Sequence, residues 1–587
     1  MKEWNLKEVY NTNLDFVNDI KKFISEVNCL SNYEGKLDNE KVIEEYFAKE
    51  EYFDRFISKI YSYGSMFFDL NQSNLEAQNN MSLLENAYTS YLKASSFASD
   101  ELLKISLDTY KEWAKSYEKI RCNLYRLDQL FHSKEHILKP EMERILANYN
   151  SVTSSFRSTY GLLESSDVKP CTVTLSDGKT VRYTKNNYTS LLEEYSNNQD
   201  DRRKIFEGLF KHYDDLKNTY AKLYKGVVDS DIAQMRSRNY DNILDTFLDN
   251  NKIDKNVYLS LINTVRKNTA PLKRYIEFRK KYFNLKEYHT YDRFLTISKE
   301  EAKYTYELAY EDVLKALEPM GKDFVEHAKV ALKEGHVDVY PHDGKRSGAY
   351  STEIDGFGPY ILLNHTDSLD SAFTLAHECG HSIHTLYSTE SQPAQTRNYV
   401  IFVAEIASTF NENLFLDYLL KKSTDKAIKI QAIEKQINNI VSTFYRQTLF
   451  ADFEYQAHQK ALSGSALTYK DLCDIMADLY YTYYGIDLNT EELKKYVWAY
   501  IPHIFNSPFY VYQYATCFSA SFKIYNDVKN NVAGAFDKYI DMLKAGGSDY
   551  PVEIVKKGGC DLTKKEAFVA VCNKLDELVD ELEKLID

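Results

Sequence analysis

No run of apolar residues in this chain is long enough to cross a membrane, and the first twenty residues contain no apolar segment of signal-peptide length. Cysteine is sparse, with eight residues scattered along 587 positions and no C-x-x-C pair. Dispersed cysteines in a large chain without an export signal are typical of a reducing compartment. We therefore expect a cytoplasmic protein that has no membrane partner.

Positively charged residues are outnumbered: 73 Lys and Arg stand against 87 Asp and Glu, which gives a formal net charge of −14. Proteins that bind nucleic acid neutralise its phosphates with clustered Lys and Arg, so this balance argues against a nucleic-acid partner. Hydrophobic residues make up 44% of the chain and charged residues 27%, as in an ordinary globular protein with a large core.

Apolar residues recur at intervals of three and four over most of the chain, and this spacing predicts amphipathic helices. Residues 1–165 follow the pattern almost throughout, and it returns over 200–335 and 398–580. Two segments depart from it. Alternating runs around Asp-Gly at 171–184 predict a β-hairpin, and a Gly-rich stretch at 337–364 contains a strand candidate.

One helical stretch carries the pattern H-E-x-x-H in His377, Glu378 and His381. Because four residues span just over one helical turn, both imidazoles lie on one face and can bind the same metal ion. Glu378 lies about 100° around the helix from His377. That position suits a general base for a metal-bound water, so the motif predicts one Zn²⁺ per chain.

A catalytic zinc site needs a third protein ligand, and Glu405 is the better candidate. It lies 24 residues beyond His381 in an apolar stretch, where a buried carboxylate is costly unless it is paired or metal-bound. Ser408 and Glu412 follow at one and two turns and can hold the ligands by hydrogen bonds, although Glu412 fits a surface charge of the helix equally well. The alternative is His384, one turn after His381. Its geometry is poor for closing a tetrahedron, so we interpret it as part of the surrounding wall.

Aromatic residues crowd the segment 497–516, which two prolines interrupt. Tyrosine hydroxyls and a histidine are donors that can stabilise an oxyanion. Packing in an aromatic core is the alternative, and it will hold for some of them. The residues concerned are Trp498, Tyr500, His503, Tyr510, Tyr512 and Tyr514.

The sequences HECGHSIH at 377–384 and FVAEIAST at 402–409 resemble the thimet-oligopeptidase-like family of zinc metallopeptidases, and most closely its bacterial oligoendopeptidase F branch. Other segments agree with that branch: 341–350, 359–364, 503–515 and 543–551. The resemblance implies a mainly α, multi-helical ellipsoid with a deep substrate channel and a small β-sheet next to the zinc helix. It also implies hydrolysis of internal peptide bonds in short, unfolded oligopeptides.

The resemblance is strong over about 200–580 and rests on length and helical character before that. We expect an N-terminal helical domain at 1–199, with the hairpin near 171–184, and a catalytic domain at 200–587.

The resemblance further implies that the aromatic segment supplies donors to the transition state. We expect His503 and Tyr510 in this role, with Tyr512 and Tyr514 as alternates that contact the substrate. The strand at 359–364, with Tyr360, would hold an extended peptide by adding it to the sheet, and a purely structural sheet edge is the alternative. His384 is expected near the substrate. Zinc would be bound by His377, His381 and Glu405, with Glu378 as the base.

Two other functions fit parts of the pattern. A metallocarboxypeptidase with a similar helical channel would need a positive group to hold the substrate carboxylate, and the sequence does not identify one. A helical binding protein with a vestigial metal site would need a damaged site, whereas ligands, base and candidate donors are all present. The sequence does not predict the oligomeric state.

Overall fold

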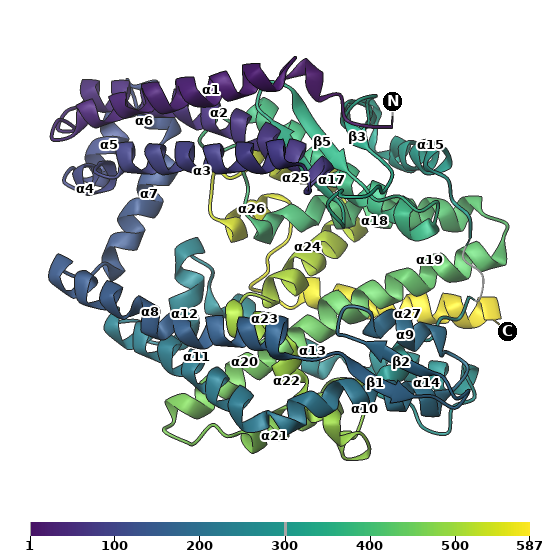
Figure 1. Cartoon of the computed structure of the whole chain (residues 1–587). Coiled ribbons are helices and arrows are strands. Elements are labelled where there is room, and N and C mark those ends of the chain that lie inside the picture. Colours follow the sequence, from purple (N-terminus) through teal and green to yellow (C-terminus); the bar gives the residue numbers. More distant parts are fainter. Residues whose placement is uncertain (1, 299–301, 587) are drawn as a thin grey trace. The chain divides into compact units, whose positions relative to one another are not determined.

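The computed structural model describes residues 2–298 and 302–586, and most of them are helical (Figure 1). The prediction of a mainly α protein with small sheets is confirmed. The chain forms two compact units. Unit 1 comprises Met1–Glu135, Glu301–Ser423 and Ile524–Cys560, and unit 2 comprises His136–Glu300, Thr424–Lys523 and Asp561–Asp587. The division into domains at residue 199 stays a prediction.

Unit 1 begins with a layer of packed helices whose bounds follow from capping and from apolar spacing. The long helix α2 starts after Asn39, whose side chain accepts hydrogen bonds from the backbone N–H groups of Lys41 and Val42. The helices of this layer are α1 (Asn13–Val27), α2 (Glu40–Leu70), α3 (Leu75–Ser95), α4 (Ala98–Leu102), α5 (Leu107–Trp113), α6 (Glu118–Cys122) and α7 (Leu124–Ser133).

A three-stranded sheet packs against this layer, with Ile354, Tyr360 and Leu362 in the shared hydrophobic core. Its strands are β3 (Val337–Asp338), β4 (Tyr350–Ile354) and β5 (Gly358–Leu362), in the order β3-β5-β4. β5 pairs in parallel with β3 and antiparallel with β4. The predicted strand at 359–364 is therefore the central strand, and β4 forms an edge of the sheet.

The remaining helices of unit 1 include the one that carries the H-E-x-x-H motif, α17 (Leu369–Ser391). Its N-terminus is capped by the Ser368 side chain, which accepts from the Ser371 backbone N–H at 3.2 Å. α17 packs along α18 (Ile401–Lys422), and the two are seen side by side in Figure 1. The other helices are α15 (Tyr306–Leu317), α16 (Lys322–Ala331), α25 (Ala535–Ala545) and α26 (Pro551–Lys557).

Gly380 allows the close contact between α17 and α18. A Cβ atom added at this position would lie 2.5 Å from the Ala407 carbonyl oxygen and 2.7 Å from Ser408 Cα. Both are backbone atoms of α18, so no side-chain rotation can relieve the overlap. The absence of a side chain at Gly380 therefore sets how closely the two helices approach.

Unit 2 contains the predicted hairpin, with β1 (Cys171–Thr174) and β2 (Thr180–Tyr183) paired antiparallel from Cys171 opposite Tyr183 to Thr174 opposite Thr180. A π-helical segment, Ile440–Tyr445, joins α19 (Lys426–Asn439) to α20 (Arg446–Leu462). α24 (Tyr512–Lys529) begins in unit 2 and ends in unit 1. The other helices are α8 (Pro140–Leu162), α9 (Tyr188–Glu194), α10 (Gln199–Asp215), α11 (Lys217–Ser237), α12 (Ile243–Leu248), α13 (Lys255–Lys267), α14 (Ala270–Tyr282), α21 (Tyr469–Tyr484), α22 (Val497–Tyr500), α23 (Pro502–Asn506) and α27 (Glu566–Ile586).

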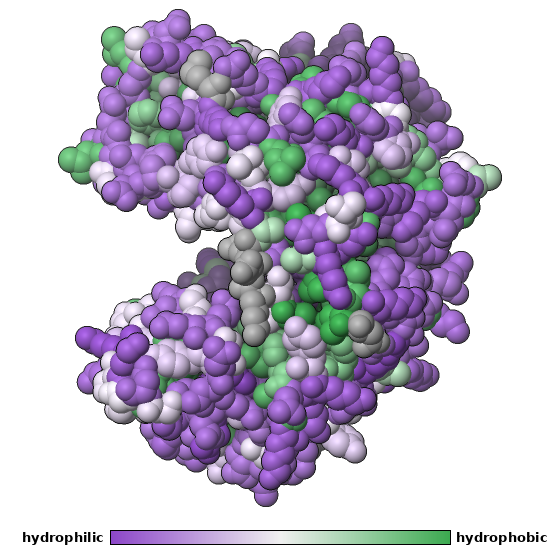
Figure 2. Space-filling view, turned by 90° about the vertical axis from the view of Figure 1, so that its right-hand side faces the viewer, coloured by the Kyte–Doolittle hydropathy of each residue, from purple (hydrophilic) through white to green (hydrophobic). Residues whose placement is uncertain are grey.

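Hydrophilic residues cover most of the face in Figure 2, and hydrophobic ones come to the surface in smaller groups. Among the described residues, none of the helices combines the length and the hydropathy that a membrane span requires.

We predict that Gly380→Ala lowers the midpoint of thermal unfolding, because the added methyl group must push α17 and α18 apart. Overpacking of this kind costs about 1–3 kcal/mol. Gly161→Ala is the matched control: Gly161 also lies in a helix, α8, but a Cβ atom there has no neighbour within 4 Å. The control should be neutral or stabilise by about 0.5–1 kcal/mol. Equal midpoints for the two variants would contradict the role given to Gly380.

Candidate metal and catalytic site

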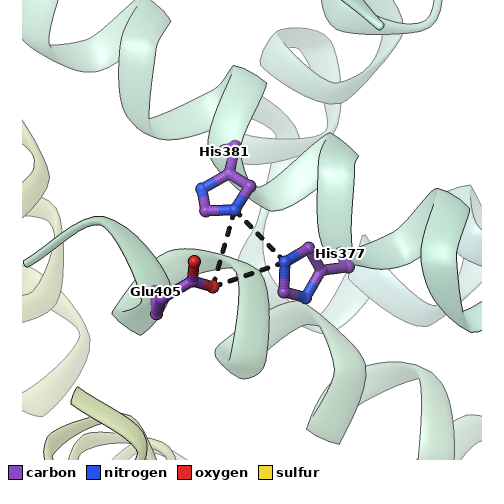
Figure 3. Close-up of side chains that lie close together, drawn as sticks. All are labelled: His377, His381 and Glu405. Atoms are coloured by element: carbon purple, nitrogen blue, oxygen red, sulfur yellow. Dashed lines mark hydrogen bonds and ion pairs between the residues drawn. The ribbon is translucent and has the colours of Figure 1, made fainter. Parts of the chain in front are cut away.

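α17 and α18 bring together the three side chains that were predicted to bind metal (Figure 3). His377 Nε2 lies 3.2 Å from His381 Nε2 and 3.4 Å from Glu405 Oε2, and His381 Nε2 lies 3.6 Å from the same oxygen. A tetrahedral ion with bonds of about 2.0–2.1 Å holds its ligand atoms about 3.3–3.4 Å apart. The three atoms therefore fit one metal ion and leave a fourth position open.

Two further residues of α18 hold these ligands in place. His377 Nδ1 lies 2.5 Å from Glu412 Oε1, so the Nδ1–H donates to this carboxylate and Nε2 is left to bind a metal. The Ser408 hydroxyl donates to Glu405 Oε2 at 2.9 Å. Ser408 and Glu412, one and two turns after Glu405, therefore make the hydrogen bonds to the candidate ligands that their spacing suggested.

The electrostatics of His381 and Glu405 favour forms that bind metal. For His377, burial alone would lower the pKa, but hydrogen bonds with Glu405 and Glu412 raise it well above its usual value. Burial lowers the pKa of His381 to about 4, and the charge of His377 acts in the same direction. Burial alone would raise the pKa of Glu405, but a hydrogen bond with His377 and the nearby histidine charges hold it at about 2. Neutral imidazole and ionised carboxylate are the states that coordinate metal.

Glu378 has the opposite environment. Its side chain is 6% exposed, and its Oε2 atom has no hydrogen-bond partner within the described ranges. Burial raises the pKa of Glu378 to about 7, and the neighbouring carboxylates of Glu405 and Glu412 add to the effect, while His377 and the Ser351 backbone N–H oppose it. A carboxyl group with this pKa can both accept and release a proton at neutral pH.

His384 lies behind the ligands and not among them. Its ring stacks on Tyr399 with centroids 3.6 Å apart, and the Tyr399 hydroxyl donates to the His381 carbonyl oxygen at 3.3 Å. Burial lowers the pKa of His384 to about 3, so the ring is neutral. Because the side chain is fully buried, it has no surface to offer a peptide in this structure. This burial does not fit the predicted contact of His384 with substrate. It fits the interpretation of His384 as part of the wall around the site.

Tyr360 also departs from its predicted role. Its side chain is fully buried, stacks on His336 with centroids 4.0 Å apart, and donates its hydroxyl hydrogen to Glu8. The expectation that 359–364 holds a peptide does not fit either, because β5 is paired along both edges. The central position of the strand, which the sequence pattern did not reveal, is the reason for both differences.

The aromatic segment of unit 2 separates into a surface group and a buried residue. His503, Tyr510 and Tyr514 cluster, with ring centroids 5.6–6.3 Å apart, and none of the three is buried. Tyr512 is 2% exposed and packs on Tyr258, with centroids 5.0 Å apart. Of the alternates, only Tyr514 therefore shares a surface with His503 and Tyr510. The metal-ligand group belongs to unit 1.

The turn before Tyr510 depends on a residue that the sequence analysis missed. Phe509 has a left-handed backbone (φ 55°), and its N–H donates to Glu454 Oε1 at 3.0 Å. Glu454 is fully buried, and burial raises its pKa well above the usual range. A carboxylate between the apolar residues of α20 was the available signal, by the same reasoning that identified Glu405.

Comparison with known proteins supplies an independent observation. The family model described as Peptidase family M3 matches residues 192–574, and that described as Oligopeptidase F matches residues 101–169. The chain belongs to peptidase family M3. The resemblance seen in its motifs is thereby confirmed, and this family M3 peptidase is similar to its relatives over nearly its whole length.

Oligopeptidase PepF of Bacillus subtilis is 33% identical to this family M3 peptidase over 99% of the chain and 87% of the relative. The oligoendopeptidase F homolog of Borreliella burgdorferi is 33% identical over 99% of this chain and 98% of the relative. The crystal structure of oligoendopeptidase-F from Enterococcus faecium superposes with a TM-score of 0.73 at 27% identity, covering 98% of this chain and 99% of that one. A crystal structure from Chlamydophila abortus superposes with a TM-score of 0.91 at 29% identity, covering 100% and 98%.

We predict that Glu412→Gln weakens metal binding about 10–100-fold, because the imidazole of His377 loses the carboxylate that orients it. Metal affinity can be measured by competition with a chromogenic chelator. Glu390→Gln is the matched control, since Glu390 also pairs with a histidine, His327, at 3.1 Å but outside the site. Unchanged affinity in Glu412→Gln would remove Glu412 from the site.

Proposed function

We propose that this chain is a zinc metalloendopeptidase that hydrolyses internal peptide bonds of short, unfolded oligopeptides. The observation that carries the proposal is the convergence of two imidazole nitrogens and one carboxylate oxygen within 3.2–3.6 Å, beside a buried carboxyl group. The relatives named oligopeptidase and oligoendopeptidase F support the substrate class. A cytoplasmic location, expected from the sequence, belongs to the same proposal.

Zinc is the metal that this donor set favours, because two histidines and one carboxylate are a recurring ligand set of catalytic zinc. His377 and His381 would bind it through Nε2, and Glu405 through Oε2. When bound, the ion would supply Lewis-acid polarisation of the scissile carbonyl and a lowered pKa for a coordinated water.

Glu378 acts as the proton carrier. Its carboxylate accepts the proton of the attacking water and then delivers it to the nitrogen of the leaving amine. The pKa of about 7 supports both halves of this cycle, since the group is neither firmly protonated nor firmly ionised at neutral pH. His503 and Tyr510 are proposed to donate hydrogen bonds to the developing oxyanion, with Tyr514 as the alternate.

The edge strand β4 is proposed to bind the substrate backbone in place of β5. The Ile361 N–H donates away from β4, to the His336 carbonyl oxygen at 2.8 Å. Ser351 pairs with Ile361, so its own backbone groups turn toward the outer edge of β4. The Ser351 backbone N–H acts to lower the pKa of Glu378, so this edge lies beside the proposed base. An extended peptide can add to such an edge as a further strand.

The function is tested with one internally quenched peptide whose two ends are blocked. We expect cleavage at an internal bond, loss of cleavage after treatment with a chelator, and recovery when zinc is added. Mass spectrometry of the products locates the cleaved bond. Release of residues only from a peptide with a free C-terminus would identify a carboxypeptidase instead. No cleavage of either peptide by zinc-loaded protein would support a binding protein.

We predict that Glu378→Gln keeps its metal and lowers kcat by about 10²–10⁴-fold, because the amide cannot accept a proton while the three ligands are untouched. Metal content by atomic emission and turnover of the quenched peptide are the two measurements. The surface variant Glu390→Gln serves again as the control. Near-normal turnover in Glu378→Gln would falsify the assignment of the base.

A further inference from the structure

Unit 2 encloses a cavity of about 320 Å³ that the proposed function does not use. It lies among α9, α14, α21, the π-helical segment Ile440–Tyr445 and two 3₁₀ turns, Thr290–Phe294 and Glu492–Tyr496. Five aromatic side chains line it: Tyr275, Tyr288, Phe294, Tyr480 and Tyr484. None of the lining residues belongs to the group that was assigned to metal binding or catalysis.

Three cations gather at this cavity without a carboxylate partner. Arg293 and Lys494 line it, and Arg446 lies close enough to affect the pKa of both. Each cation lies over an aromatic ring, at 4.8 Å from Phe294, 4.8 Å from Phe210 and 5.3 Å from Phe450 respectively. Across the described residues, none of the three forms an ion pair. A fourth cation, Arg279, is already bonded to Glu434 at 3.3 Å and to backbone carbonyls.

Among the described residues, neither nearby carboxylate, Glu491 or Glu193, forms an ion pair with these three cations. Glu491 accepts hydrogen bonds from the backbone N–H and the hydroxyl of Thr290. Glu193 lines the cavity, and partial burial raises its pKa. Burial lowers the pKa of Lys494 to about 7, and Arg446 and Arg293 add to this effect while Glu491 opposes it. The cavity therefore holds repelling positive charges that an anion would relieve.

We propose that this cavity binds a small organic oxyanion that carries two negative charges. Guanidinium groups present paired N–H donors that match the oxygen atoms of a phosphate or carboxylate. The tyrosine rings and Phe294 offer flat faces to the apolar part of such a molecule. The volume is within the range of small-molecule sites. The chemistry recognised is the dianion, whether it comes from a phosphate ester or from a dicarboxylate.

The proposal is tested by titration calorimetry on the full-length, zinc-loaded protein with two probes, phenyl phosphate and succinate. We expect at least one to bind, and benzyl alcohol, which has the ring without the charge, not to bind. The probe that binds more tightly identifies the source of the oxyanion. Because Lys494 must gain a proton beside the dianion, the apparent enthalpy should vary with the ionisation enthalpy of the buffer.

Three variants make the result specific to the cavity. Arg293→Gln and Arg446→Gln should each weaken binding about tenfold or more, the size expected for a lost charged hydrogen bond. Lys494→Met should abolish the dependence on the buffer. Arg182→Gln, an exposed arginine on β2, is the control and should bind as the wild type does. Cleavage of the quenched peptide, expected to be retained, reports that each variant is folded.

The thermal midpoint gives a second measurement that does not depend on calorimetric heat. Removing one of three repelling cations should raise the midpoint of Arg293→Gln, and phenyl phosphate or succinate should raise that of the wild type. The proposal is overturned if neither probe binds, or if a probe binds Arg293→Gln and Arg446→Gln as tightly as the wild type.

Discussion

The contact between α17 and α18 at Gly380 is the constraint on which the proposed site depends. Only a hydrogen atom fits between Gly380 Cα and the Ala407 carbonyl, which a Cβ atom would approach to 2.5 Å. At this separation Glu405 reaches both histidines of α17, and Glu412 reaches His377 from two turns further along α18. The geometry of the proposed metal ligands is therefore a consequence of backbone packing, and the side chains only complete it.

The same close packing produces opposite pKa shifts in neighbouring carboxyl groups. Glu405 faces two imidazoles, and its pKa is held at about 2. Glu378, one residue after His377, is buried near two other carboxylates, and its pKa rises to about 7. Desolvation acts on both groups, so the charged neighbours decide the difference. The proposed ligand, which stays ionised, and the proposed base, which can exchange protons, are thus obtained from one amino-acid type.

Unit 2 shows how groups that are distant in the sequence acquire a common environment. Arg293, Arg446 and Lys494 come from three separate segments, yet two of them line one cavity and Arg446 lies near enough to affect the pKa of both. Their repulsion has no benefit for the fold by itself, because half-buried like charges without ion-pair partners are unfavourable. An anionic ligand gives this arrangement a physical reason.

The sequence by itself determined the elements whose signals are local. Three- and four-residue spacing located the helices, Asp-Gly located the hairpin, and the positions of His377, Glu378, His381 and Glu405 followed from helical periodicity and from the cost of a buried carboxylate. Tertiary structure decided the rest. Tyr360 is buried because its strand is the central one of the sheet. Tyr512 points into the core, whereas Tyr510 and Tyr514 share a surface. Contacts between remote segments determine which strands pair, which residues are buried and which groups surround a charge. A local sequence pattern does not contain this information.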